Sequence, residues 1–252
     1  MAVAPPDEVI KDSAKNSTVT SLDMLMANIP QPTAIGKELS KEGVQLNKAL
    51  CNSPDKASSY SSTFQQAVNM GVYGADLGYL SCYNQTQDVM QYFAQVAKMG
   101  TSLGVGSVFD QHLVDLLGKA ANNNKDTLNA LVQTAFDRAQ KELYSNKRAT
   151  VGTLIFAGGW VEGLYIATNM VKDEKNGKND QLYQKIWDEL YAIRYLQQAL
   201  GDYQKTNTDC ANMLNIIKPI SDASANLSDD GLKLKDVQSI QTMVAEIRGK
   251  LI

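Results

Sequence analysis

Apolar residues recur every three or four positions along most of this chain, the spacing that places them on one face of an α-helix. The strict alternation of apolar and polar residues that is typical of strands does not occur over a useful length. Prolines break helices, and none lies between Pro54 and Pro219. We therefore predict an all-α protein, a helical bundle of about eight helices.

Capping and turn residues divide this pattern into segments. Thr33 is a candidate cap for a first helix whose apolar stripe extends to Leu50. The sequence Asn52-Ser53-Pro54-Asp55 ends that helix and starts the next. The further helices are predicted at about 55–83, 89–103, 107–121, 125–144, 149–172, 181–200, 204–218 and 232–251.

Two apolar segments, 71–83 and 157–168, are unusually rich in glycine. A glycine inside a helix costs about 1 kcal/mol relative to alanine, and close approach of another backbone is the usual reason for keeping it. The spacings of three and four place these glycines on one face of each helix. We predict that the two segments are the central helices of the bundle and are too short and too interrupted to span a membrane. The glycines concerned are Gly71, Gly74, Gly78, Gly159 and Gly163.

Each central segment carries one carboxylate followed three residues later by a tyrosine, Asp76 with Tyr79 and Glu162 with Tyr165. A carboxylate on an apolar helix must be hydrogen-bonded, paired with a cation or protonated. One interpretation is a structural network in the core. The other is a shared pocket, because two helices that cross here would bring the two acids close together.

Aromatic residues on or beside the same helices extend this candidate site. Tyrosine combines an apolar body with one polar group, which suits both core networks and binding surfaces. We leave both interpretations open and assign no catalytic residue. The candidate ligand-binding residues are Asp76, Tyr79, Tyr83, Trp160, Glu162 and Tyr165.

An internal similarity links the two halves of the chain. Residues 87–104 align without a gap with residues 184–201, and each window follows a glycine-rich segment with its acid and tyrosine. We predict a single helical domain at 30–252 made of two four-helix repeats, about 55–146 and 149–252, related by a pseudo-two-fold axis.

Charge and residue types exclude several kinds of function. The net charge of −3 and pI of about 5.3 give no basic surface for nucleic acid. His112 is the single histidine, and no Glu-x-x-His or Cys-x-x-Cys occurs, so neither a metal site nor a cofactor is predicted. We expect free buried thiols, although one disulfide is possible, at Cys51, Cys82 and Cys210.

The first 29 residues are predicted to be a polar tether with a short apolar lead-in. The sequence after Met1 lacks the apolar core of a signal peptide. Either an artificial methionine that replaces an export signal or a native cytosolic tail would produce such a start.

The central motifs resemble a family of uncharacterised, secreted helical lipoproteins from Bacteroides-type Gram-negative bacteria. The resemblance rests on residues 71–79, 83–88 and 158–165 and covers most of residues 30–200. It implies an exported precursor with a lipid-bearing cysteine upstream of Met1. It also implies a domain held in the periplasm or at the outer membrane, and it supplies no activity and no site residues.

Three hypotheses for function emerge. The first is a non-enzymatic cell-envelope module that binds a partner protein or a small apolar ligand, recognisable by a concave tyrosine-lined groove or an exposed apolar patch. The second is a small-molecule receptor or enzyme that uses Asp76 and Glu162 with the tyrosines, which requires an open cavity. The third is a closed core in which both acids are satisfied.

Overall fold

The computed structural model shows an all-α protein, as the hydrophobic periodicity predicts. No strand occurs among the residues that the structure describes. The predicted tether, residues 1–20, lies outside them. The described residues are 21, 23–25, 27, 28, 31, 33–83, 85–123, 125–145, 148–227 and 231–252.

From residue 33 on, the described part of the chain contains nine α-helices and three short 3₁₀-helices, and the described residues 21, 23–25, 27 and 28 are also helical. The α-helices are α2 (Ala34–Lys41), α3 (Thr63–Ser81), α4 (Thr86–Ser102), α5 (Gln111–Asn123), α6 (Lys125–Ser145), α7 (Ala149–Met170), α8 (Asp180–Tyr203), α9 (Thr208–Ser224) and α10 (Leu234–Leu251). The 3₁₀-helices are η1 (Lys48–Leu50), η2 (Pro54–Ser59) and η3 (Gly106–Phe109).

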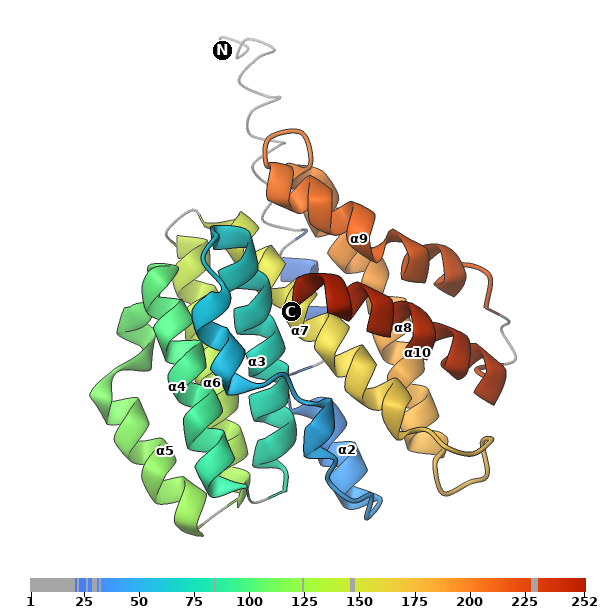
Figure 1. Ribbon diagram of the computed structural model, residues 1–252, viewed down its shortest axis with the longest axis horizontal. Coiled ribbons are helices and arrows are strands. Elements are labelled where there is room, and N and C mark those ends of the chain that lie inside the picture. The colour runs from blue at the N-terminus through green and yellow to red at the C-terminus, as the bar shows by residue number, and fades with distance from the viewer. Residues whose placement is uncertain are drawn as a thin grey trace, which may run out of the picture.

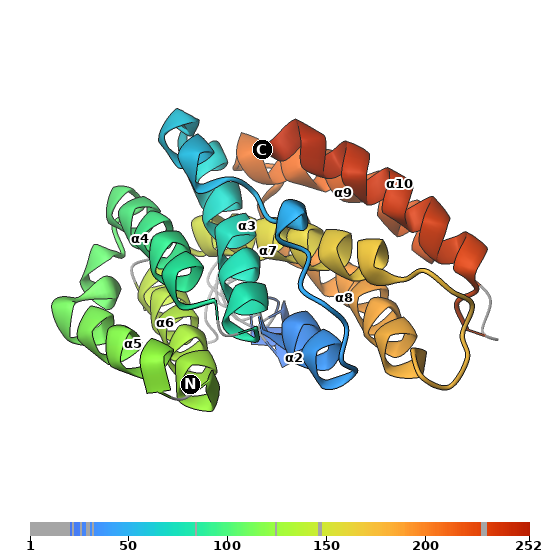
Figure 2. The same ribbon diagram turned by 60° about the horizontal axis from the view of Figure 1, so that its bottom comes forward.

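The two glycine-rich helices, α3 and α7, lie at the centre of the bundle and pack against each other (Figure 1). Helices α4, α5 and α6 lie on one side of this pair, and α8, α9 and α10 lie on the other. Helix α3 contacts α4 and α6, and α7 contacts α8 and α10. The turned view shows α2 below the crossing of the central pair (Figure 2).

Glycines permit the close contact between α3 and α7. A methyl group built at Gly71 would overlap the carbonyl oxygen of Ile155, and one at Gly158 would overlap that of Val68. The prediction of backbone-to-backbone packing is therefore confirmed, and Gly159 lies in the same contact. Two other predicted glycines serve different neighbours: Gly74 faces the ring of Phe136 on α6, and Gly163 faces Glu189 on α8.

Helix α7 agrees with the predicted helix 149–172 to within two residues, but it corrects the prediction that this segment is too short and too interrupted to span a membrane. With 22 residues and a mean hydropathy of 1.3, it is the one helix in the described part of the chain long and apolar enough to cross a membrane. However, 67% of that stretch is buried inside the protein. Its apolar character is accounted for by its central position, where it packs against α3, α8 and α10.

The region between α2 and α3 corrects two predictions. The first helix ends at Lys41 instead of reaching Leu50, because Gly43 takes a left-handed φ of 72° and turns the chain. The predicted helix 55–83 starts only at Thr63, where a capping box joins Ser62 and Gln65. Residues 42–62, here called the connecting segment, cross over the central helices (Figure 2).

Candidate functional site

The carboxylates of Asp76 and Glu162 come together in the core between α3, α7 and α10. Both residues are 0% exposed, and their carboxyl groups lie close enough for each to alter the pKa of the other. Helix α3 supplies one acid and α7 the other, because their glycines let the two backbones approach. The predicted closeness of the two acids is confirmed.

Arg248 of α10 neutralises Glu162. Its Nε donates to Glu162 Oε2 at 2.6 Å and its Nη2 donates to Glu162 Oε1 at 2.8 Å, a bidentate ion pair. The same Nη2 donates to the Leu50 carbonyl at 2.9 Å. The guanidinium also lies over the ring of Tyr165, 4.3 Å from its centroid. Since only 12% of the Arg248 side chain is exposed, this pair is nearly closed to water.

Among the described residues, no cation forms an ion pair with Asp76. Its Oδ2 accepts a hydrogen bond from the Asn52 backbone N–H at 2.9 Å, while its buried Oδ1 meets no N–H or O–H donor of the described residues. Burial raises the pKa of the Asp76 carboxyl well above its ordinary value, and the neighbouring charge of Glu162 raises it further. A protonated Asp76 that donates to Glu162 satisfies both carboxyl groups.

Cys51 and Asn52 of the connecting segment close this cluster. Burial raises the pKa of the Cys51 thiol, and the neighbouring charges of Asp76 and Glu162 raise it further, so the sulfur stays protonated at neutral pH. The described structure contains no disulfide, and its three cysteines are thiols. Cys82 and Cys210 are buried as predicted, whereas Cys51 is only partly buried.

Tyrosine hydroxyls fasten the connecting segment to the bundle. Those of Tyr73 and Tyr92 donate to the carbonyls of Ser53 and Asn52, at 2.7 and 2.9 Å. Two of the candidate ligand-binding tyrosines also form hydrogen bonds with the connecting segment. The hydroxyl of Tyr79 accepts from the Asn47 N–H, and that of Tyr83 donates to the Val44 carbonyl, both at 3.0 Å.

The six candidate residues therefore separate into three groups. Asp76, Glu162 and Tyr165 meet in one cluster, and Tyr79 and Tyr83 hold the connecting segment. Trp160 lies elsewhere in the core, where its Nε1 donates to the Glu189 carbonyl of α8 at 2.9 Å.

Glu189 is a further buried acid, and the sequence pattern did not single it out. The residue is 4% exposed. Burial raises the pKa of its carboxyl to about 8, and the neighbouring charge of Asp188 adds to this while Lys185 opposes it. The side chain therefore carries a proton at neutral pH.

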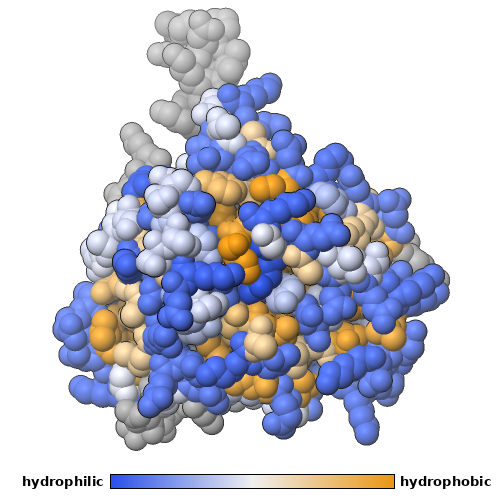
Figure 3. All heavy atoms as spheres, in the orientation of Figure 1, coloured by the Kyte–Doolittle hydropathy of each residue, from blue (hydrophilic) through white to orange (hydrophobic). Residues whose placement is uncertain are grey.

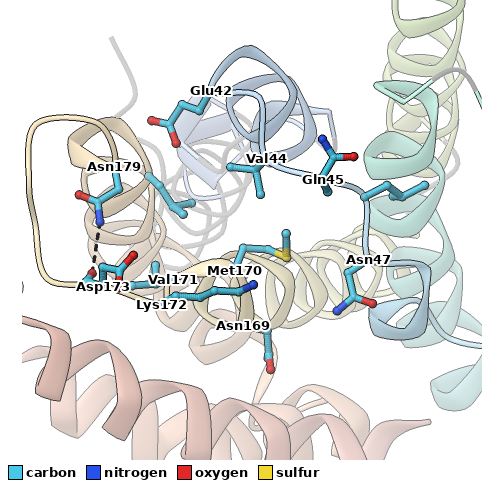
Figure 4. Close-up of a pocket in the computed structure, with 12 residues that line it drawn as sticks. Glu42, Val44, Gln45, Asn47, Asn169, Met170, Val171, Lys172, Asp173 and Asn179 are labelled. Atoms are coloured by element: carbon cyan, nitrogen blue, oxygen red, sulfur yellow. Dashed lines mark hydrogen bonds between the residues drawn. The ribbon is translucent and has the colours of Figure 1, made fainter.

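Among the pockets at the surface of the described residues are two that neither Asp76 nor Glu162 lines. The first, of about 490 Å³, lies between residues 42–47, the end of α7 and the start of α8 (Figure 4). Its apolar surface comes from Val44, Met170 and Leu182, and its polar surface includes Glu42 and Lys172. No aromatic residue lines it.

The second is a groove of about 230 Å³ between α8 and α9. Trp187, Leu190 and Tyr191 line it from α8, and Leu227 lines it from beyond the end of α9. Tyr191 is 53% exposed, one of two large hydrophobic residues so exposed in the described part of the chain. The guanidinium of Arg194 lies 3.3 Å from the centroid of the Tyr191 ring.

Arg194 is held between two tyrosines. Its Nη2 donates to the Tyr195 hydroxyl at 2.9 Å, and its guanidinium lies 4.7 Å from the centroid of that ring. No ion pair joins it to an acid among the described residues. An aromatic surface with a cation that no acid of the described residues neutralises therefore borders the groove.

The described residues on the face of the molecule seen in Figure 3 form no large hydrophobic patch. Hydrophilic residues predominate on it, and hydrophobic ones form small groups between them. In the described part of the chain, no group of three or more His, Cys, Asp and Glu side chains is arranged to hold a metal ion.

Comparison with known proteins gives no relative: no family model, no curated protein and no solved structure matches the chain. The geometry of the described residues is therefore the basis for assigning a function.

Proposed function

We propose that this chain is a non-enzymatic binding module of the cell envelope. In this proposal the groove between α8 and α9 receives an apolar side chain of a partner protein. The observation that carries the proposal is the exposed Tyr191 ring, held under Arg194 at the edge of an apolar groove.

The residue types of the groove favour a protein partner. Trp, Tyr and Arg are the residues most enriched among those that dominate binding energy at protein interfaces. The groove combines Trp187, Tyr191 and Arg194 within two turns of α8. Because Arg194 stacks on two rings, little side-chain entropy remains to be lost when a partner binds.

The size of the groove favours a side chain over a free ligand. Pockets for small molecules generally measure about 300–1,000 Å³. At about 230 Å³ the groove is smaller and fits one apolar side chain. The unneutralised guanidinium of Arg194 favours a carboxylate next to that side chain on the partner. The expected partner segment therefore has an apolar anchor residue with an acidic neighbour.

The envelope location in this proposal rests on the resemblance of the glycine-rich motifs to secreted lipoproteins. A lipid anchor upstream of this chain would hold the module at the outer membrane or in the periplasm. Fractionation of the source cells, with palmitate labelling of the precursor, tests this part separately.

A photo-crosslinking experiment tests the groove. Benzoyl-phenylalanine replaces Tyr191 in one variant and the exposed Gln184 of the same helix in a control variant. The proposal predicts one cross-linked envelope protein from position 191 only, lost when Arg194→Met is added. The purified partner should then bind the Arg194→Met protein at least tenfold more weakly. Equal labelling from both positions, or none from position 191, contradicts the proposal.

The alternative proposal is a receptor or enzyme that uses Asp76 and Glu162. Its support is the convergence of the two carboxylates and the raised pKa of Asp76. The bidentate contact with Arg248 weighs against it, because the cation already occupies the position that a ligand would take.

We also propose that the two halves arose by internal duplication. In support, α3 packs with α4 and α6 as α7 packs with α8 and α10, and the cross contacts of α6 with α7 and of α10 with α3 are both present. The glycine contacts are reciprocal at an offset of 87, because Gly71 meets Ile155 and Gly158 meets Val68. Asp76 and Glu162 are 86 residues apart in sequence, so the two acids are shifted by one position from the offset of 87 that relates the glycine contacts.

A further inference from the structure

The 490 Å³ pocket at the end of α7 has opposite charges on facing walls. Glu42, just after α2, lies on one side, and Lys172, just after α7, lies on the other (Figure 4). Between them the apolar surface of Val44 and Met170 forms part of the lining. The pocket volume falls within the range of about 300–1,000 Å³ that small-molecule sites occupy.

The Glu42 wall favours a cation. The backbone N–H of Leu182 lies close enough to this carboxylate to lower its pKa, and the buried Oε1 of Glu42 has no donor among the described residues. Burial raises the pKa of this carboxyl, and the charges of Glu38 and Asp180 raise it further, against the opposing effect of Lys41. An ammonium group in the pocket would relieve this excess of negative charge.

The opposite wall favours an anion. Lys172 is exposed and forms no ion pair within the described part of the chain. Near it, Asn47 uses its Oδ1 to accept from the Ala49 N–H, so its amide nitrogen stays available as a donor. A carboxylate here would meet an ammonium donor and an amide donor.

We propose that this pocket binds a small zwitterion, a free α-amino acid with an aliphatic side chain. Its ammonium group lies toward Glu42, its carboxylate toward Lys172, and its side chain against Val44 and Met170. Other ligand classes fit the lining less well. A sugar or a nucleobase would find no aromatic ring to stack on, and a polyanion would find Lys172 as the one cationic side chain among the lining residues.

Titration calorimetry of the full chain with L-leucine tests the proposal at pH 7. Two analogues separate the charges: leucinamide keeps the ammonium and lacks the carboxylate, and 4-methylpentanoate has the reverse. We expect saturable binding of leucine and at least tenfold weaker binding of each analogue. Lys172→Gln should weaken leucine binding at least tenfold and leave leucinamide binding unchanged.

Two further variants complete the design. The exposed Lys175→Gln lies outside the pocket lining and serves as the matched control, with leucine binding unchanged. Glu42→Gln should weaken leucine and leucinamide alike, and its unfolding curve shows whether loss of the contact to α8 has altered the fold. Absence of saturable leucine binding, or equal binding by the wild type and Lys172→Gln, overturns the proposal. The groove between α8 and α9 plays no part in either result.

Discussion

Two arginines stack on tyrosine rings in the described part of this protein, and their surroundings differ. Arg248 lies 4.3 Å from the centroid of the Tyr165 ring and binds Glu162 through two nitrogens. Arg194 lies 3.3 Å from the centroid of the Tyr191 ring and has no acidic partner in the described part of the chain. The first pair is closed off between α7, α10 and the connecting segment, whereas the second is at the surface beside a groove.

The role of a stacked arginine–tyrosine pair therefore depends on whether an acid neutralises the arginine and whether the pair is buried. Arg248 stabilises a buried carboxylate and fixes α10 against the core, so it is structural. Arg194 has the same stacking but retains charge that nothing in the described structure neutralises, so it is available to a partner. Variants of the core and of the groove test this contrast, from the largest expected effect to the smallest.

Glu162→Gln should destabilise far more than Asp76→Asn, although the sequence presents the two acids as equivalents. Loss of the Glu162 charge leaves Arg248 buried and unpaired, at a cost of about 3–5 kcal/mol. The amide introduced by Asp76→Asn can donate to Glu162 and accept from Asn52, as protonated Asp76 does, so its cost should stay below about 1 kcal/mol. Urea unfolding at pH 7 measures both, and equal losses would refute a proton on Asp76.

Gly71→Ala should lower stability by about 1–3 kcal/mol or more, because the added methyl group overlaps the Ile155 carbonyl of α7. Gly118→Ala on α5 is the matched control, since nothing lies within 4 Å of a methyl group there. That control should gain up to about 1 kcal/mol from helix propensity. Thermal unfolding compares the two, and a neutral Gly71→Ala would contradict the close crossing of α3 and α7.

The raised pKa of Glu189 predicts a pH dependence. The folded state holds this proton until about pH 8, whereas an unfolded glutamate loses it near pH 4.5, so stability falls as pH rises through that window. Glu189→Gln removes this titrating group and should flatten the plot of unfolding free energy against pH. Each unit by which folding raises the pKa of Glu189 corresponds to about 1.4 kcal/mol of unfolding free energy. Unfolding free energies between pH 4 and 9 test it. A wild-type profile that rises with pH, or a variant with an unchanged slope, would contradict the buried protonated state.

Tyr191→Ala should have the smallest effect on the fold. The side chain is 53% exposed, and its contact with Arg194 lies in water, so the unfolding free energy should stay close to that of the wild type. Binding of the partner should weaken by about 2 kcal/mol, since the ring borders the groove. Unfolding and affinity are measured on the same preparation. A variant that loses stability and keeps its affinity would make Tyr191 a structural residue.

The hydrophobic pattern was sufficient to predict the helical class and most helix positions. The central pair was predictable because glycines three or four residues apart on one helix face usually mark the close approach of another backbone. The limits of α2 and α3 were not, because the apolar residues of the connecting segment also fit a helical stripe. The start of α3 is fixed by the Ser62–Gln65 capping box, a signal that the prediction of a helix at 55–83 did not use.

The candidate site was predictable only in part. The meeting of Asp76 and Glu162 followed from the glycine faces, but their cation did not. Arg248 lies 86 residues after Glu162, and the distance in sequence hides a contact that only the packing of α10 creates. A buried acid requires a partner. The chain has four arginines that could pair with Glu162, and the sequence does not show which of them does: Arg138, Arg148, Arg194 and Arg248. The exposed groove gave no sequence signal, since Trp187 and Tyr191 fit the apolar pattern of any amphipathic helix.

The most direct test of the contrast between the two arginines is urea unfolding of Arg248→Met beside Arg194→Met at pH 7. Removing Arg248 leaves the Glu162 charge buried without a cation, so the account predicts a loss of about 3–5 kcal/mol. Removing Arg194 gives up one exposed stacking contact, and the predicted unfolding curve is close to that of the wild type. Equal losses, or a larger loss for Arg194→Met, would contradict the assignment of the buried pair to the fold and of the exposed pair to binding.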